Sequence, residues 1–209
     1  MIRSLWALRE TNPGFTPQNV LTMTVPAAKS SENSRRTFFS DEFVPRVATI
    51  PGVKSVGAID TLPMRGGSEQ PIAVEGRPVE VFALQRNGSV RRATPGYFRT
   101  MEIPMLSGRD FSLADTTSEK AVVVISQSMA DLFWPGENPI GKRFRISFTP
   151  ETVREVIGVA GDIKNRGLQI PEPITMLYLP IRQNDGGGVS LVVRGQGEVT
   201  LLTTAISKV

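Results

Sequence analysis

Hydrophobic and polar positions alternate in short stretches of the chain, which is the period-two pattern of half-buried β-strands. The clearest is VLTMTVP at 20–26, where Thr22 and Thr24 alternate with larger apolar side chains. AVVVI at 121–125 is apolar throughout and predicts a buried strand. Further strands are predicted at 53–63, 142–147, 153–163, 174–180 and 189–195, with two or three more within 71–95.

A helical pattern follows the first strand. Phe39, Phe43 and Val47 recur at every fourth position and predict one apolar ridge of a helix within 31–50. Pro45 lies inside this ridge, and because proline has no backbone N–H, we expect a kink or an early end there.

A second helix is predicted to begin at Ser126, a residue type that caps helix N-termini well. Its apolar face would carry Met129, Leu132 and Phe133, and Pro135-Gly136 would end it. Short helices are also expected at 1–10 and from 198 to the chain end. Helices mixed with hairpins and strands predict an α+β (mixed α/β) fold.

Two glycine-containing motifs predict turns. Asn87-Gly88 predicts a β-hairpin, because both residues tolerate positive φ. PGYFRTMEIPMLSGRDF at 95–111 predicts a short helical turn with Tyr97, Phe98 and Met101 on its apolar face. Arg109-Asp110 at its end can pair or cap at the surface.

Composition narrows the chemistry available to this chain. Its 209 residues are 40% hydrophobic and 21% charged, which is typical of a globular domain with a real core. The chain has no histidine and no cysteine, which excludes Ser-His-Asp and Cys-His catalysis and zinc sites of the usual Cys/His kind. Lysine and arginine are spread along the chain, so a net charge of +4 predicts a mildly basic solvated surface and no nucleic-acid partner.

One motif has the spacing of a phosphate-binding loop. GENPIGK at 136–142 matches G-x-x-x-x-G-K, but that chemistry needs a strand before the loop and a helix after it. Here a predicted helix precedes and a predicted strand follows. Arg143 stands where a Ser or Thr hydroxyl would hold magnesium, and Pro139 removes a cradle amide. We therefore interpret the motif as a helix-to-strand turn.

The remaining polar residues form no recognisable catalytic set. Asp60, Asp110, Asp115 and Asp162 lie in contexts typical of turns, caps and strand ends. No lysine follows a serine at the S-x-x-K spacing, and Ser118–Lys120 and Ser207-Lys208 are expected at the surface. We predict no enzyme activity, no catalytic, cofactor-binding or metal-binding residue, and no cofactor.

Five motifs in order nevertheless resemble a known family. They are NPGFTPQNVLTMTV, IPGVKSVGAIDTLPMRGG, TPGYFRTMEIPMLSGRDF, VVVISQSMADLFWPGENPIGKRF and VIGVAGDIKNRGL, and the resemblance spans roughly residues 3–207. The chain resembles the MacB-like extracytoplasmic domain of ABC-transporter permeases, with the greatest similarity to the duplicated orphan permease type.

The resemblance implies a two-lobed periplasmic core domain. Residues 1–15 would be the end of the first transmembrane helix and a linker. Residues 16–62 plus 186–209 would form a split strand–helix–strand lobe, and 63–185 an inserted mixed lobe. No stretch of the chain itself reaches the ~18 apolar residues of a membrane span.

The resemblance also implies a function. The domain would be non-catalytic, face the periplasm or extracellular side of the inner membrane, and relay ATP-driven conformational change in transport or efflux. Its partners would be a second permease subunit or half, a cytosolic ABC ATPase acting through the membrane part, and a possible periplasmic adaptor. An alternative is a ligand-sensing domain that binds a small molecule between its lobes.

Overall fold

The computed structural model describes residues 12–25, 38–75, 87–117, 119–146, 149–167, 175–184, 188–197 and 202–208. It is a mixed α+β fold dominated by strands, as predicted. The strands are β1 (Val20–Val25), β2 (Val53–Ile59), β3 (Glu69–Val74), β4 (Asn87–Ala93), β5 (Met105–Gly108), β6 (Val122–Ser126), β7 (Arg143–Ile146), β8 (Thr149–Ala160), β9 (Met176–Pro180) and β10 (Val189–Gly195). The helices are η1 (Phe38–Phe43), α3 (Val44–Ala48), α4 (Tyr97–Met101), α5 (Gln127–Phe133), η3 (Ile181–Gln183) and α6 (Leu202–Ile206).

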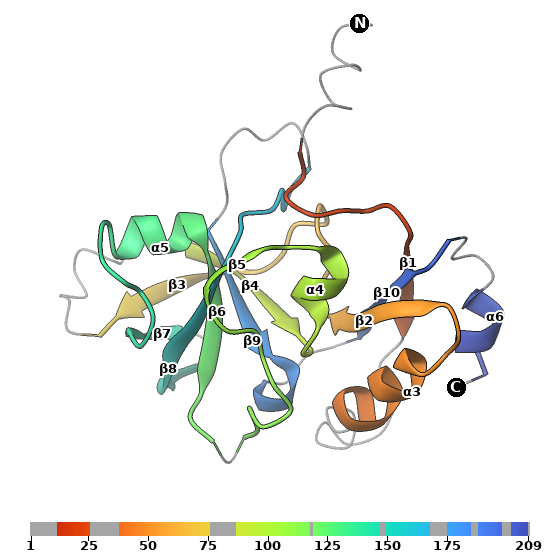
Figure 1. Ribbon diagram of the computed structural model, residues 1–209. Coiled ribbons are helices and arrows are strands. Elements are labelled where there is room, and N and C mark those ends of the chain that lie inside the picture. Colours follow the sequence, from red (N-terminus) through yellow and green to blue (C-terminus); the bar gives the residue numbers. More distant parts are fainter. Residues whose placement is uncertain are drawn as a thin grey trace, which may run out of the picture.

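The strands are arranged in two parts (Figure 1). β1, β10 and β2 form an antiparallel three-strand sheet. β4, β3, β7, β8, β6 and β9 pair in that order, and β9 pairs back to β4, so these six strands close into a barrel. Strand pairing connects the three-strand sheet to the barrel at one residue pair, Ile59 of β2 opposite Ala93 of β4. A closed ring leaves fewer unpaired strand edges than an open sheet.

Burial on both faces explains the apolar run at 122–126. Val123 and Ile125 point into the core inside the barrel, and Val122 and Val124 belong to a second core outside it. The parallel pairing of β6 with β8 fits this pattern, because parallel strands are commonly covered on both sides.

Three apolar cores result from this arrangement. The first fills the barrel and includes Met129 and Phe133 of α5. The second lies around α4, with Tyr97 and Phe98 fully or almost fully buried. The third lies between the three-strand sheet and the helices η1, α3 and α6. The predicted ridge of Phe39, Phe43 and Val47 belongs to this third core.

Pro45 changes the helix type and does not end the helix. Residues Phe38–Phe43 form a π-helix and Val44–Ala48 an α-helix, with Pro45 in the first turn of the latter. Proline is tolerated in a first turn, because the N–H that it lacks has no partner inside the helix there. The predicted helix start around 31 lies outside the described residues.

The predicted Asn87-Gly88 hairpin is wrong. Both residues lie inside β4, opposite Pro71 and Gln70 of β3. Gly88 serves packing and not turn geometry: a Cβ there would lie 2.6 Å from Ile72 Cδ1 and 2.8 Å from Leu177 Cδ2. The helix predicted at 1–10 lies outside the described residues.

The predicted N-cap and end of the second helix are confirmed. Ser126 Oγ accepts a hydrogen bond from the Met129 N–H at the start of α5. Gly136 follows the helix with φ 74°, a conformation that glycine adopts without strain. The strand predicted at 53–63 is shorter than expected: β2 begins at Val53, as predicted, but ends at Ile59.

Candidate functional site

The chain enters the fold through a segment that contacts both the barrel side and the three-strand sheet. We call residues 12–19 the entry strap; it crosses the upper side of the molecule in Figure 1 before it becomes β1. At its beginning, the Lys164 N–H donates to the Pro13 carbonyl at 2.9 Å. Gly14 has φ 81°, and a Cβ there would lie 2.0 Å from the Asp162 carbonyl oxygen, so only glycine fits this approach.

Arg194 of β10 holds the second half of the strap. Its Nη2 and Nη1 donate to the carbonyls of Thr16 at 2.7 Å and Gln18 at 2.8 Å. Its Nε donates to the Thr100 carbonyl of α4 at 2.8 Å. The guanidinium is buried, with 5% of the residue exposed, and its planar set of donors suits three fixed carbonyls. One side chain therefore joins β10, the strap and α4.

The strap also completes the C-terminal end of α4. The last four carbonyls of a helix have no partner within it. In α4 the Phe98 and Arg99 carbonyls accept from the N–H groups of Ile103 and Glu102. The Thr100 carbonyl accepts from Arg194, and the Met101 carbonyl accepts from the Thr16 N–H at 2.9 Å. The position of the strap is thus coupled to the end of this helix.

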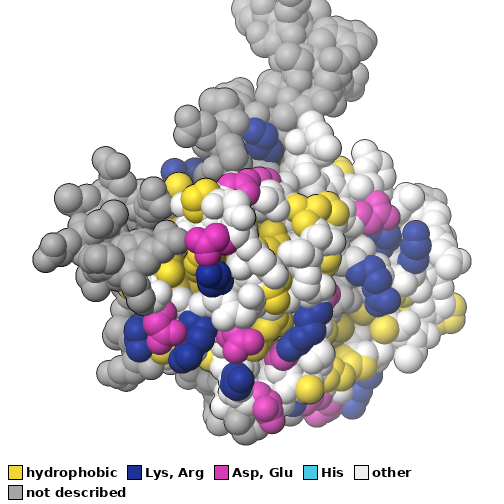
Figure 2. Space-filling model, turned by 60° about the vertical axis from the view of Figure 1, so that its left-hand side comes forward, with side chains coloured by type: hydrophobic (Ala, Val, Ile, Leu, Met, Phe, Trp, Pro, Cys, Tyr) yellow, Lys and Arg dark blue, Asp and Glu magenta, His cyan; other side chains and the backbone are white. Residues whose placement is uncertain are grey.

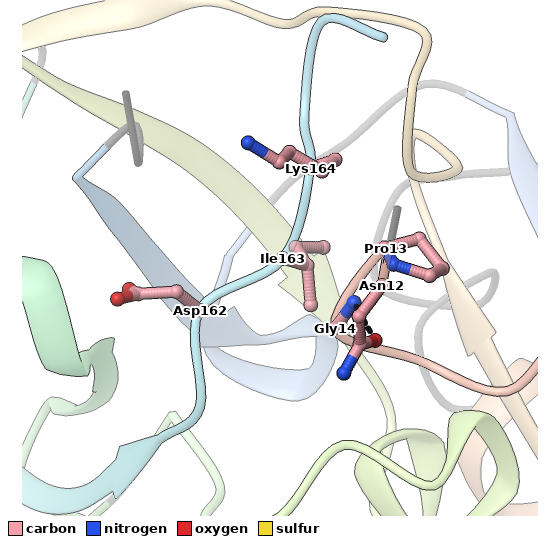
Figure 3. Close-up of a pocket in the computed structure, with 6 residues that line it drawn as sticks. All are labelled: Asn12, Pro13, Gly14, Asp162, Ile163 and Lys164. Carbon is pink, nitrogen blue, oxygen red and sulfur yellow. Dashed lines mark hydrogen bonds between the residues drawn. The ribbon is translucent and has the colours of Figure 1, made fainter. Parts of the chain in front are cut away.

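A shallow hollow of about 230 Å³ lies where the strap meets the segment after β8 (Figure 3). Asn12 folds back on the strap, where its Oδ1 accepts from the Gly14 N–H at 2.9 Å. The side chains of Asp162 and Lys164 point away from Pro13. The hollow therefore offers backbone and apolar atoms, and we assign it no chemistry.

The four carboxylates singled out from the sequence have separate local roles. Asp60 pairs with Arg92 at 3.1 Å. Asp162 accepts from both the N–H and the hydroxyl of Ser128 in the first turn of α5. The contact of Asp162 is a helix-capping role, as predicted, whereas Asp60 forms an ion pair with a residue of β4 and neither a turn nor a cap.

Asp110 and Asp115 fix the loop after β5. Asp110 accepts from the N–H groups of Gly96 and Phe111; burial raises the pKa of Asp110, and these two hydrogen bonds oppose that effect. Burial would also raise the pKa of Asp115, but hydrogen bonds from Arg109 and Ser112 outweigh it and the pKa is lowered. Arg109 binds Asp115 through both carboxylate oxygens at 2.8 Å, so its partner is Asp115 and not the adjacent Asp110.

The phosphate-loop spacing at 136–142 belongs to a turn, as predicted. α5 precedes it and β7 follows it. The Gly141 N–H donates to the Val156 carbonyl, and Lys142 pairs with Glu137 at 2.6 Å, so both groups are already used within the protein. Among the described residues, no group of three or more acidic side chains could hold a metal ion.

Surface charge is mixed. Figure 2 shows basic and acidic side chains interspersed on one face of the molecule. Several of them pair, as Arg143 does with Glu75 at 3.2 Å, and such exposed pairs add little stability.

The buried arginines were missed by the sequence reasoning. Arg91 is 1% exposed and donates to the Gly66 carbonyl, Asn165 and Ser89. Desolvation lowers the pKa of Arg91, and the nearby Asp60 carboxylate opposes the shift. A Cβ at Gly67 would lie 1.7 Å from Arg91 Nη1, which explains the glycine in a segment that reads as a plain turn. The sequence carries no local signal for them, because an arginine at a strand end, such as Arg194, is ordinarily a solvated charge.

Comparison with known families decides the assignment. The model of the MacB-like periplasmic core domain matches residues 6–205. The chain belongs to this family. The matched region covers nearly all of the chain, in agreement with the span of the five motifs.

Solved structures show the same fold. The periplasmic region of MacB from Actinobacillus actinomycetemcomitans is 17% identical with a TM-score of 0.59, over 97% of this chain and 86% of that one. The extracellular domain of the noncanonic ABC-type transporter YknZ from Gram-positive bacteria is 21% identical with a TM-score of 0.52, over 88% of both chains. No curated protein matches the sequence.

The MacB-like periplasmic core domain is an extracytoplasmic part of ABC-transporter permeases, and this chain is such a domain. The family implies an assembly with an ATPase and partner components, and domains of this kind are in general non-catalytic. Within the described part of the chain, no helix is long and apolar enough to cross a membrane.

Proposed function

We propose that this domain relays ATP-driven conformational change from the membrane to the extracytoplasmic side and contacts an adaptor or substrate there. The observation that carries the proposal is the entry strap, which is bonded to the segment after β8, to α4 and, through Arg194, to β10. A segment bonded to both parts of the fold transfers a displacement to both. A loop bonded to only one part would not.

The division into lobes belongs to this proposal. Residues 16–62 and 186–209 would move as one lobe and 63–185 as the other. Two features support it: the three-strand sheet has its own apolar core with η1, α3 and α6, and its ladder meets the barrel at one residue pair. Residues 1–15 would lead from the first transmembrane helix. The domain would thus face the periplasm or exterior, with a second permease half, a cytosolic ATPase and an adaptor as partners.

The test uses the full-length permease in membrane vesicles, with ATP hydrolysis and transport measured together. Arg194→Lys keeps the charge but replaces the three-way donor set with a single ammonium group. We expect hydrolysis to continue while transport per ATP falls several-fold. Arg166→Lys is the matched control, because Arg166 lies at the surface and pairs there with Glu69. Unchanged coupling in Arg194→Lys, with faster amide exchange in the strap, contradicts the proposal.

Ligand sensing is the second candidate function. The observation in its favour is a hollow formed jointly by residues of α3 and of the segment around α4. Its volume of about 220 Å³ is below the ~300–1,000 Å³ of sites for drug-sized ligands. A sensor built on this hollow would take a smaller molecule.

A further inference from the structure

The hollow between α3 and the start of α4 has a partly apolar lining. Val44 and Pro45 of α3, Val56 of β2, and Pro95 and Leu113 contribute to it. We call it the junction hollow. Leu113 is 51% exposed, although the loop around it is fixed by the Arg109–Asp115 pair. An apolar side chain held in place at the rim of a concave surface favours contact with an apolar group.

Ser40 is one of the residues that line this hollow, and its hydroxyl group is buried. The residue is 2% exposed and its Oγ has no hydrogen-bond partner in the described structure. Buried polar groups are nearly always hydrogen-bonded, so an unpaired one needs an explanation. Ser40 lies in the π-helix η1, and π-turns are rare and frequent at functional sites. A ligand oxygen would satisfy this hydroxyl.

Arg99 supplies the charge. It lies in the last turn of α4, lines the hollow, is exposed, and has no ion pair among the described residues. The nearby Asp110 carboxylate feels the charge of Arg99, which helps to lower its pKa against the effect of burial. Asp110 accepts hydrogen bonds from two backbone N–H groups and, among the described residues, none from Arg99. The guanidinium of Arg99 therefore keeps its donors for an incoming anion.

We propose that the junction hollow binds a small monocarboxylate with a short apolar tail. The carboxylate contacts the Arg99 guanidinium and accepts from the Ser40 hydroxyl, and the tail packs between Val44, Val56 and Leu113. The volume of about 220 Å³ limits the tail to a few carbons. This binding does not depend on whether the domain relays motion, because it is a property of the isolated chain.

The test is an NMR titration of the 209-residue chain with hexanoate, and with hexanamide as the uncharged isostere. Hexanoate is expected to bind with a millimolar Kd, typical of so small a ligand, and to shift the amides of Val56, Thr94 and Gly96. Hexanamide is expected to bind at least about fivefold more weakly, because it lacks the charge-assisted contact.

Three variants locate the contacts. Arg99→Gln is expected to weaken hexanoate at least about fivefold, whereas Arg46→Gln, on the adjacent α3 but outside the hollow, leaves the Kd unchanged. Ser40→Ala is expected to weaken hexanoate while the ligand-free chain becomes no less stable, since its hydroxyl has no partner there. If Ser40 had only a structural role, Ser40→Ala would not weaken hexanoate binding while leaving the stability of the ligand-free chain unchanged.

Three results overturn the proposal. They are no saturable shift at up to about 50 mM hexanoate, equal binding of hexanamide, and equal effects of Arg46→Gln and Arg99→Gln. The last would show attraction to the general positive charge of the chain. A failure of hexanoate binding leaves the coupling measurement with Arg194→Lys untouched, so the two hypotheses are tested separately.

Discussion

Replacement of Arg194 by methionine tests the central contact of the entry strap. Methionine keeps much of the buried volume but donates no hydrogen bond. The change removes donors from the carbonyls of Thr16, Gln18 and Thr100, which Arg194 reaches at 2.7, 2.8 and 2.8 Å. The structure therefore predicts a loss of stability and a release of the strap together.

The expected decrease in the free energy of unfolding depends on how exposed those three carbonyls are to water. A hydrogen bond to a charged group contributes about 1.5–3 kcal/mol, so three of them set an upper limit of about 9 kcal/mol. Gln18 is exposed and Thr16 half-buried, so water can replace the arginine at both; Thr100 is fully buried and its carbonyl would lose its donor. We expect a decrease of about 2–4 kcal/mol in the free energy of unfolding, or about 5–15 °C in Tm.

The assay is urea unfolding combined with hydrogen exchange. The Thr16 N–H, which donates to Met101, and the Gly195 N–H, which donates to Asn19, report on the strap and should exchange faster in Arg194→Met. Arg166→Met is the control and should change stability by no more than about 0.5 kcal/mol. A loss below about 1 kcal/mol with unchanged protection of both amides would refute the reasoning, because the strap would then be held by its backbone contacts alone.

Three further predictions concern the barrel, the second core and pH. Gly88→Ala should destabilise the protein by about 1–3 kcal/mol in urea unfolding, since its Cβ meets Ile72 at 2.6 Å; a neutral result would place residue 88 outside the strand. Tyr97→Phe should be neutral or stabilising by up to about 1 kcal/mol, because the buried Tyr97 hydroxyl has no partner in the described structure. The carboxyls of Asp115 and Asp110 should show opposite pH dependence. Because folding lowers the pKa of Asp115, this group stabilises the protein at pH values above the pKa of about 3.9 that it has in the unfolded chain, and the stabilisation is lost as the pH falls. Because folding raises the pKa of Asp110, that group stabilises the protein at low pH, and the stabilisation is lost as the pH rises. Stability of Asp→Asn variants at each position, followed from pH 7 down to about pH 3, would expose a wrong sign in either case.

Local structure was predictable where a residue acts through its own neighbours. The ridge of Phe39, Phe43 and Val47 and the cap at Ser126 are confirmed, because helix periodicity and capping depend on residues three or four positions apart. The family assignment is likewise confirmed by the match over residues 6–205.

Long-range pairing was not predictable from the same patterns. Asn87-Gly88 has the composition of a tight turn, yet both residues pair with the antiparallel neighbour β3, and the parallel pairing with β9 begins at the next residue, Ser89. Strand pairing outweighs the local turn propensity of this dipeptide. Ile72 and Leu177 also pack into the space that a side chain at position 88 would occupy. The closure of the barrel depends on strands some ninety residues apart, and no short-range signal encodes it.

The buried arginines show why the contacts between Arg194, the entry strap and α4 were not predicted from the sequence. In the sequence, an arginine at a strand end reads as a solvated charge, since this residue type is mostly exposed. Arg194 departs from that rule because carbonyls of the strap and of α4 converge on it, and these come from positions 94 to 178 residues away. Only the folded chain brings them together.

The segment 95–111 now has a physical explanation in terms of contact between the two parts of the fold. Gly57 of β2 has no Cβ, and one there would lie 2.7 Å from the Tyr97 Cα, so α4 rests directly on the three-strand sheet. The other side of α4 packs into the core that includes Val124 and Tyr178 of the barrel strands. At its C-terminal end the Met101 carbonyl accepts from the Thr16 N–H of the strap, and the Thr100 carbonyl accepts from Arg194, which also binds the strap. If the domain transmits motion, α4 is one rigid contact through which a displacement can pass between the two parts, and substitutions that loosen its end should lower transport per ATP hydrolysed without altering any reactive group.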